Sequence, residues 1–139
     1  MLRWLAQFWS HSPKQSGLGD RGENVAADYL EQHGFRILER QARGVYGELD
    51  LIAVDADTIV FIEVKTRATS ATGDPTEAVT AAKQKKITQS ALAYLKKRRW
   101  LERRCRFDVV AILWKGSGLP DVKHYRSAFE ATGNGQMYS

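Results

Sequence analysis

Two runs of strand-type sequence, joined by a short acidic turn, predict a β-hairpin between Gly47 and Arg67. The first run is GELDLIAV, in which side chains alternate in type, and the second is IVFIEVKTR. A hairpin fixes which side chains face each other, so this segment constrains the fold more than any other part of the chain. We expect Ala56 and Asp57 to form its two-residue turn.

With that turn, two acidic residues lie directly opposite each other. Asp50 faces Glu63 across the hairpin. Glu48 faces Lys65 on the same side of the sheet, because strand side chains alternate with a period of two. A register shift of one residue would instead set Asp50 opposite Ile62 and separate the two acids.

Opposed carboxylates repel each other on a sheet unless a cation lies between them. We therefore expect Asp50 and Glu63 to bind Mg²⁺ or Mn²⁺, since these ions prefer oxygen ligands. Such an ion polarises a phosphate and lowers the pKa of a bound water, and Lys65 would orient that water or stabilise developing negative charge. The alternative is that both acids face solvent and that Lys65 pairs with Glu48.

Ten of the 21 basic residues lie between Lys83 and Arg106, where Glu102 is the one acid. This segment carries +9, so the rest of a chain with a net charge of +5 carries −4. We interpret it as a surface that contacts phosphates, because a merely soluble helix usually carries both signs. The alternative is the solvated face of a helix and its following turn. The residues assigned to this basic stripe are Lys83, Lys85, Lys86, Lys96, Lys97, Arg98, Arg99, Arg103 and Arg104.

The 139-residue chain is long enough for one domain, which we place at residues 19–131. Residues 1–18 are expected to be a flexible appendage and residues 132–139 a disordered tail. The expected elements are a helix from Asp20 to Gly34, strands over residues 35–40, 49–54, 58–66 and 107–114, a second helix from Asp74 past Tyr94, and a last strand within 121–130.

A cytoplasmic location fits the rest of the composition. The single cysteine, Cys105, excludes an internal disulfide, and the three histidines are too scattered to suggest a zinc site. No apolar run of about 18 residues is present to span a membrane, and the N-terminus lacks the features of an export signal.

Several short motifs follow one another in the chain: GxxGExxAxxYL from Gly19, GF at Gly34, GELDLI from Gly47, EVKxR from Glu63, GxPxEAV from Gly73 and RFDVV from Arg106. Together they resemble the YraN-like family of small, poorly characterised bacterial proteins over most of residues 19–130. That family is similar in fold to archaeal Holliday-junction resolvases and restriction-type endonucleases. The resemblance implies an α/β fold with a restriction-endonuclease-like core, a mixed β-sheet of about four or five strands flanked by helices.

The resemblance also implies a site built from an acid on the first helix, an aspartate on the second strand and a Glu-x-Lys on the third. In this chain these residues are Glu23, Asp50, Glu63 and Lys65, and the three acids would be the metal ligands. Glu23 has a second interpretation, because Asp20 followed by Glu23 is the pattern of a capping box at a helix start.

The sequence thus favours a metal-dependent endonuclease that hydrolyses phosphodiester bonds in structured or branched DNA. If branched DNA is the substrate, a homodimer would place two sites on two strands. The alternative is a non-catalytic nucleic-acid-binding module that uses the basic stripe within residues 83–106.

Overall fold

The computed structural model describes residues 19–68 and 74–132. The expected appendage, residues 1–18, lies outside these ranges, and so does the expected tail apart from its first residue. That residue is Thr132, whose backbone N–H donates a hydrogen bond to Oγ1 of Thr88 at 3.2 Å.

Five strands form one mixed sheet in the order β1-β2-β3-β4-β5. The first three, β1 (Arg36–Gly44), β2 (Gly47–Asp55) and β3 (Thr58–Ala68), are antiparallel neighbours. β4 (Cys105–Trp114) runs parallel to β3, and β5 (Asp121–Phe129) runs antiparallel to β4. This confirms the expected α/β class and mixed sheet, an architecture compatible with a restriction-endonuclease-like core.

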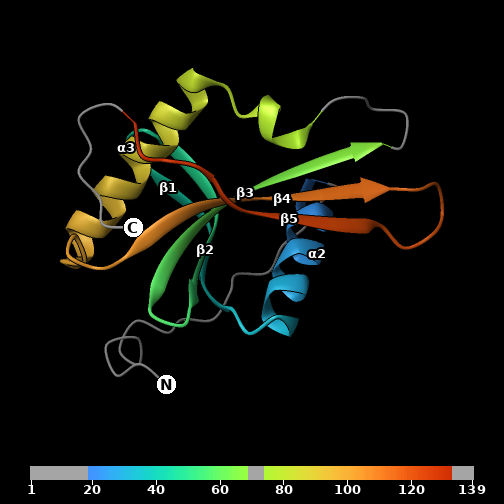
Figure 1. Ribbon diagram of the computed structural model, residues 1–139, viewed down its shortest axis with the longest axis horizontal. Helices are drawn as coiled ribbons and strands as arrows, with labels where there is room; N and C mark the ends of the chain where they lie inside the picture. The colour runs from blue at the N-terminus through green and yellow to red at the C-terminus, as the bar shows by residue number, and fades with distance from the viewer. Residues whose placement is uncertain (1–18, 69–73, 133–139) are drawn as a thin grey trace.

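One face of the sheet is covered by helix α2 (Gly19–Gln32), shown in blue in Figure 1. Ala26 and Leu30 are fully buried on this helix and pack in a cluster with Val60 and Val110 of the central strands. The middle and the C-terminal half of α2 therefore pack on the central strands.

The opposite face is covered by helix α3 (Ala81–Arg98), which buries Ala91 and Leu95 against Phe61 and Val109. This helix forms the crossover that two parallel strands, β3 and β4, require. No helix in the part of the chain that the structure describes is long and apolar enough to cross a membrane.

The second predicted helix begins later than expected. Pro75–Ala78 form a separate 3-10 turn, η1, and Asp74 caps it by accepting a hydrogen bond from the Thr76 N–H at 2.9 Å. α3 has its own cap, because Oγ1 of Thr80 accepts from the Lys83 N–H at 3.2 Å. The prediction of one continuous helix from Asp74 was wrong because the sequence contains two helix-start signals within six residues.

The β2–β3 hairpin has the predicted register. Asp55 pairs with Thr58 around the two-residue turn, and the pairing continues to Leu51 and Ile62. Beyond that pair, β2 pairs only with β1 and β3 pairs only with β4. We call the place where these two strands separate the fork. Asp50 and Glu63 are the first residues beyond the last pair.

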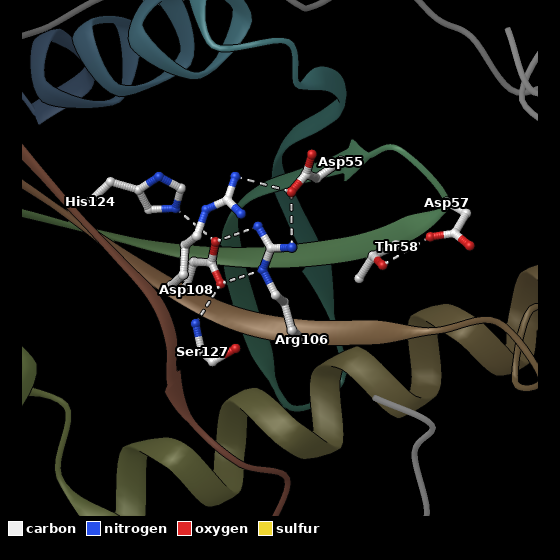
Figure 2. A network of polar contacts seen from close by, with 8 residues as sticks. Asp55, Asp57, Thr58, Arg106, Asp108, His124 and Ser127 are labelled. Carbon is white, nitrogen blue, oxygen red and sulfur yellow. Dashed lines mark hydrogen bonds and ion pairs between the residues drawn. The ribbon is translucent and has the colours of Figure 1, made fainter.

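A buried polar network joins β2, β4 and β5 at the end of β2 that leads into the hairpin turn. Asp108 is fully buried on β4 and accepts two hydrogen bonds from Arg106, at 3.0 and 3.1 Å, and one from the Ser127 N–H, at 3.0 Å. His124 Nε2 lies 2.7 Å from the same carboxylate. Arg106 also contacts Asp55 at 2.9 Å, so the network links β2, β4 and β5 (Figure 2). Its members are internally satisfied, which indicates a structural role for Asp108.

Candidate active site at the fork

Asp50 is held at the fork by the backbone of the neighbouring strand. Its Oδ2 accepts a hydrogen bond from the Val64 N–H at 2.9 Å. Because β2 and β3 no longer pair here, the carboxylate supplies the acceptor that a strand carbonyl would otherwise provide. The side chain of Asp50 therefore has a fixed position and points toward β3.

The carboxyl groups of Asp50 and Glu63 are in direct contact. Burial, the hydrogen bond to Glu63 and the charge of Glu63 raise the pKa of Asp50 to about 9. The pKa of Asp50 is therefore the raised one of the pair, while Glu63, which is 9% exposed, has its pKa lowered. For Glu63, burial alone would raise the pKa, but hydrogen bonds from Asp50 and Lys83 outweigh it and lower the pKa. The predicted proximity of the two acids is present in the structure.

Two lysines face this pair of acids. Lys83 Nζ of α3 lies 2.8 Å from Oε2 of Glu63. Lys65 lies two residues beyond Glu63 on β3, and burial together with the neighbouring Lys83 lowers its pKa. The sequence placed Lys83 in the basic stripe and did not predict its contact with Glu63. The one sequence signal was a lysine in the first turn of a helix, where acids are favoured.

Glu23 approaches the site from the opposite layer. Its negative charge contributes to the raised pKa of Asp50, after the larger effects of burial and Glu63. Within the described ranges, no three acidic, histidine or cysteine side chains form a ready-made metal cluster. The structure thus brings Asp50 and Glu63 together and leaves Glu23 further out. The capping interpretation of Glu23 depends on Asp20, whose side chain lies outside the described part.

The expected pairing of Glu48 with Lys65 is not formed. Nε of Arg43, on β1, lies 3.1 Å from Oε2 of Glu48 instead. The β2–β3 pairing stops before this position, so Glu48 stays with its β1 neighbour while Lys65 follows β3 toward β4. The alternative interpretation, in which a salt bridge to Glu48 occupies Lys65, was therefore wrong.

The basic stripe divides into engaged and exposed members. Lys83 pairs with Glu63, and Arg98 pairs with Glu39 while its guanidinium lies 3.7 Å from the centre of the Tyr94 ring. Arg103 is half-buried. The exposed members are Lys85, Lys86, Lys96, Lys97, Arg99 and Arg104. These six side chains on α3 and the turn after it form the part of the stripe that a polyanion could reach.

The donors at the fork fit a divalent cation that prefers oxygen. Two carboxyl groups are held in contact, one of them kept protonated by burial and by the charge of the other. A bound cation would remove the repulsion between the two acids that raises the pKa of Asp50. The chain is therefore an α/β protein whose mixed sheet is compatible with a restriction-endonuclease-like core, and its paired acids and lysines meet where β2 and β3 separate.

Comparison with known proteins places the chain within a family. The model of the uncharacterised protein family UPF0102 matches residues 22–112. A UPF0102 protein of Geobacter metallireducens is 47% identical over 113 residues, which cover 81% of this chain and 92% of the relative. A UPF0102 protein of Chlorobium phaeobacteroides is 47% identical over 119 residues, covering 82% and 94%. One of Rhodococcus opacus is 46% identical over 114 residues, covering 81% and 95%.

The chain therefore belongs to the UPF0102 family, which is the YraN-like family that its motifs resemble. The matched region includes the whole fork and both lysines that face it.

Proposed function

We propose that this protein is a metal-dependent endonuclease that hydrolyses phosphodiester bonds in structured or branched DNA. The observation that carries this proposal is the contact between the Asp50 and Glu63 carboxyl groups beside Lys65 at the fork. A buried pair of acids next to a lysine costs folding energy, so its presence is better explained by chemistry than by stability.

Asp50 and Glu63 would hold Mg²⁺ or Mn²⁺, and Glu23 would add negative charge to the site. A bound divalent ion supplies a Lewis acid and a water of lowered pKa. The Val64 N–H keeps the Asp50 carboxylate oriented throughout. Lys65 places a positive charge beside the acids, where it can stabilise negative charge that develops on a phosphate.

The exposed members of the basic stripe would hold the nucleic acid. The first turn of α3 meets the fork through Lys83. The helix then carries Lys85 and Lys86 close by, and Lys96 and Lys97 at its other end. Eighteen residues of helix extend for about 27 Å, so the stripe could contact phosphates both near the fork and far from it. Contacts of this kind recognise backbone shape rather than base sequence, which suits a branched substrate. A homodimer would offer two such sites to two strands.

A non-catalytic nucleic-acid-binding module is the second candidate. It is favoured by the ion pair of Lys83 with Glu63, which already neutralises one acid, and by the separation of Glu23 from the other two carboxylates. On this proposal the basic stripe binds phosphates and the fork has a structural role only.

Cleavage assays separate the two candidates. Purified protein is incubated with four-way junction, single-stranded and duplex DNA in Mg²⁺ or Mn²⁺ and in EDTA. The endonuclease proposal expects metal-dependent cleavage that is lost in Asp50→Ala and Lys65→Ala and retained in Glu31→Ala, a matched change of an exposed acid on α2. Cleavage that survives both site changes would contradict the proposed site. Binding that weakens steeply with salt, without any cleavage, would favour the binding module.

A further inference from the structure

Lys83 behaves differently from the exposed lysines of the same helix. Its ammonium lies 2.8 Å from Glu63, and its side chain is 40% exposed, whereas the side chain of Glu63 is 10% exposed. Lys85 and Lys86, which follow directly, are exposed. Lys83 thus reaches inward from the solvent edge and ends on a buried acid.

The position of Lys83 in α3 has a cost for the helix. It lies in the first turn, three residues after the Thr80 cap, and this turn contains no acid. A cation near a helix N-terminus opposes the helix dipole, by about 0.3–1 kcal/mol at exposed sites. Helix stability therefore does not account for a lysine here, and the contact with Glu63 must offset its cost.

The contact adds the positive charge of Lys83 to a pair of acids that Lys65 also faces. A lysine ammonium is a compact charge on a flexible stem, so it can satisfy Glu63 and can also swing into solvent. Glu63 is at the same time in contact with Asp50. A divalent ion held by Asp50 and Glu63 would compete with the ammonium of Lys83 for Glu63.

We propose that Lys83 is a positioning residue that holds Glu63 in the absence of a divalent ion, and that ion binding releases Lys83 to contact a phosphate of the nucleic acid. This inference rests on the proposed function, specifically on metal binding by Asp50 and Glu63. It couples the two ligands: the ion frees Lys83 for the nucleic acid, and by reciprocity the nucleic acid strengthens ion binding.

Calorimetric titration with Mn²⁺ tests the competition. Lys83→Met removes the competing charge and is expected to bind Mn²⁺ about tenfold more tightly than the wild type, which corresponds to about 1.4 kcal/mol. Lys85→Met, the same change at an exposed position of the same helix, is expected to bind like the wild type. Equal or weaker binding by Lys83→Met would overturn the role of Lys83.

Lysine acylation tests the release in the unmodified sequence, so it does not depend on a variant that folds. The rates of acetylation of Lys83 and Lys85 by an N-hydroxysuccinimide ester are compared by peptide mass spectrometry with and without Mn²⁺. The expected result is a slower reaction at Lys83 than at Lys85 in EDTA, and faster acetylation of Lys83 alone when Mn²⁺ is present. An unchanged rate at Lys83 under saturating Mn²⁺ would overturn the release.

These outcomes distinguish this inference from the proposed function. If neither the wild type nor Lys83→Met binds Mn²⁺, both the metal site and the role of Lys83 are wrong. If both proteins bind Mn²⁺ equally well, the metal site stands and only the role of Lys83 fails. Binding by Lys83→Met alone would support competition in its strongest form.

Discussion

Gly22 of α2 lies directly against Thr66 of β3, with no room for a methyl group between them. A Cβ atom built on Gly22 would lie 2.2 Å from Oγ1 of Thr66. Glycine inside a helix lowers helix stability by about 1 kcal/mol relative to alanine. The close contact with Thr66 explains why this position is nevertheless a glycine. The close approach brings the first turns of α2 to the fork, where the charge of Glu23 reaches Asp50.

Replacing Gly22 with alanine is therefore expected to destabilise the protein even though alanine favours helices. Overpacking of this kind costs about 1–3 kcal/mol. Urea denaturation of Gly22→Ala measures the loss. The control is the Gly22→Ala/Thr66→Ala double variant, in which the clashing hydroxyl is absent and most of the stability should return. Equal effects of Gly22→Ala in both backgrounds would show that the contact is not the cause.

Asp50→Asn is expected to stabilise the protein in EDTA. The amide can still accept from the Val64 N–H and can donate to Glu63, but it removes the acid whose ionisation is unfavourable next to Glu63. An increase of about 1 kcal/mol would raise the melting temperature by about 4 °C in a domain of this size.

The same variant should lose the stabilisation that Mg²⁺ or Mn²⁺ gives to the wild type, because binding of an ion to the folded state raises its stability. The control is Asp57→Asn, at the exposed hairpin turn, which should respond to the ions like the wild type. A melting temperature for Asp50→Asn below that of the wild type in EDTA would contradict the unfavourable pairing of the two acids.

Neutralising the far end of α3 should weaken nucleic-acid binding without affecting the fork. The triple variant Lys96→Gln/Lys97→Gln/Arg99→Gln removes three exposed charges. If all three contact phosphates, the slope of log affinity against log salt concentration should decrease in magnitude by about two to three. Fluorescence anisotropy with labelled junction DNA measures this slope.

The control for that surface changes the same number of charges elsewhere. Arg43, Lys115 and Lys123 are exposed residues of β1, the β4–β5 turn and β5. Their replacement by glutamine should lower affinity less and leave the slope nearer that of the wild type. Equal slopes for the two triple variants would mean that binding depends on net charge alone and that α3 is not the binding surface.

The hairpin and its acids were predictable because the signals are local. Alternation along two runs and a two-residue turn determine a register, and the register places Asp50 opposite Glu63. The Glu48–Lys65 pair failed because the alternation does not reveal where two paired strands separate. That separation follows from β3 remaining paired with β4 up to Ala68, a contact between distant parts of the chain.

Lys83 could not be placed at the fork from sequence because its partner lies on a different element. The contact with Glu63 depends on where α3 begins, which is set by η1 and the Thr80 cap rather than by the first helix-start signal at Asp74. The run of basic residues in the sequence therefore gave no sign that Lys83 faces inward while Lys85 and Lys86 are exposed.

Cys105 provides a probe of the folded state. Its side chain is buried at the start of β4, and burial raises the pKa of its thiol to about 11. The thiolate is the reactive form, so the native protein should react very slowly with Ellman's reagent at pH 8. Complete reaction of the one thiol is expected in denaturant. Rapid reaction of the native protein would show that β4 opens locally.

Asp108 should make the protein sensitive to acid. Burial would raise its pKa, but hydrogen bonds from His124, Arg106 and the Ser127 N–H outweigh burial and lower it. Since the pKa is lower in the folded state than the ordinary value of about 3.9, the stabilisation is fully present above that value and is lost as pH falls through the folded-state pKa. Asp108→Asn should thus be less stable than the wild type near neutral pH, with a difference that narrows toward about pH 3 in urea denaturation. As a control, the free energy of unfolding of Asp57→Asn, a change at the exposed hairpin turn, should differ from that of the wild type by the same amount at every pH. Carbon-13 NMR titration of the Asp108 carboxyl in the wild type gives an independent measurement, and protonation at or above its ordinary pKa would contradict the network's effect.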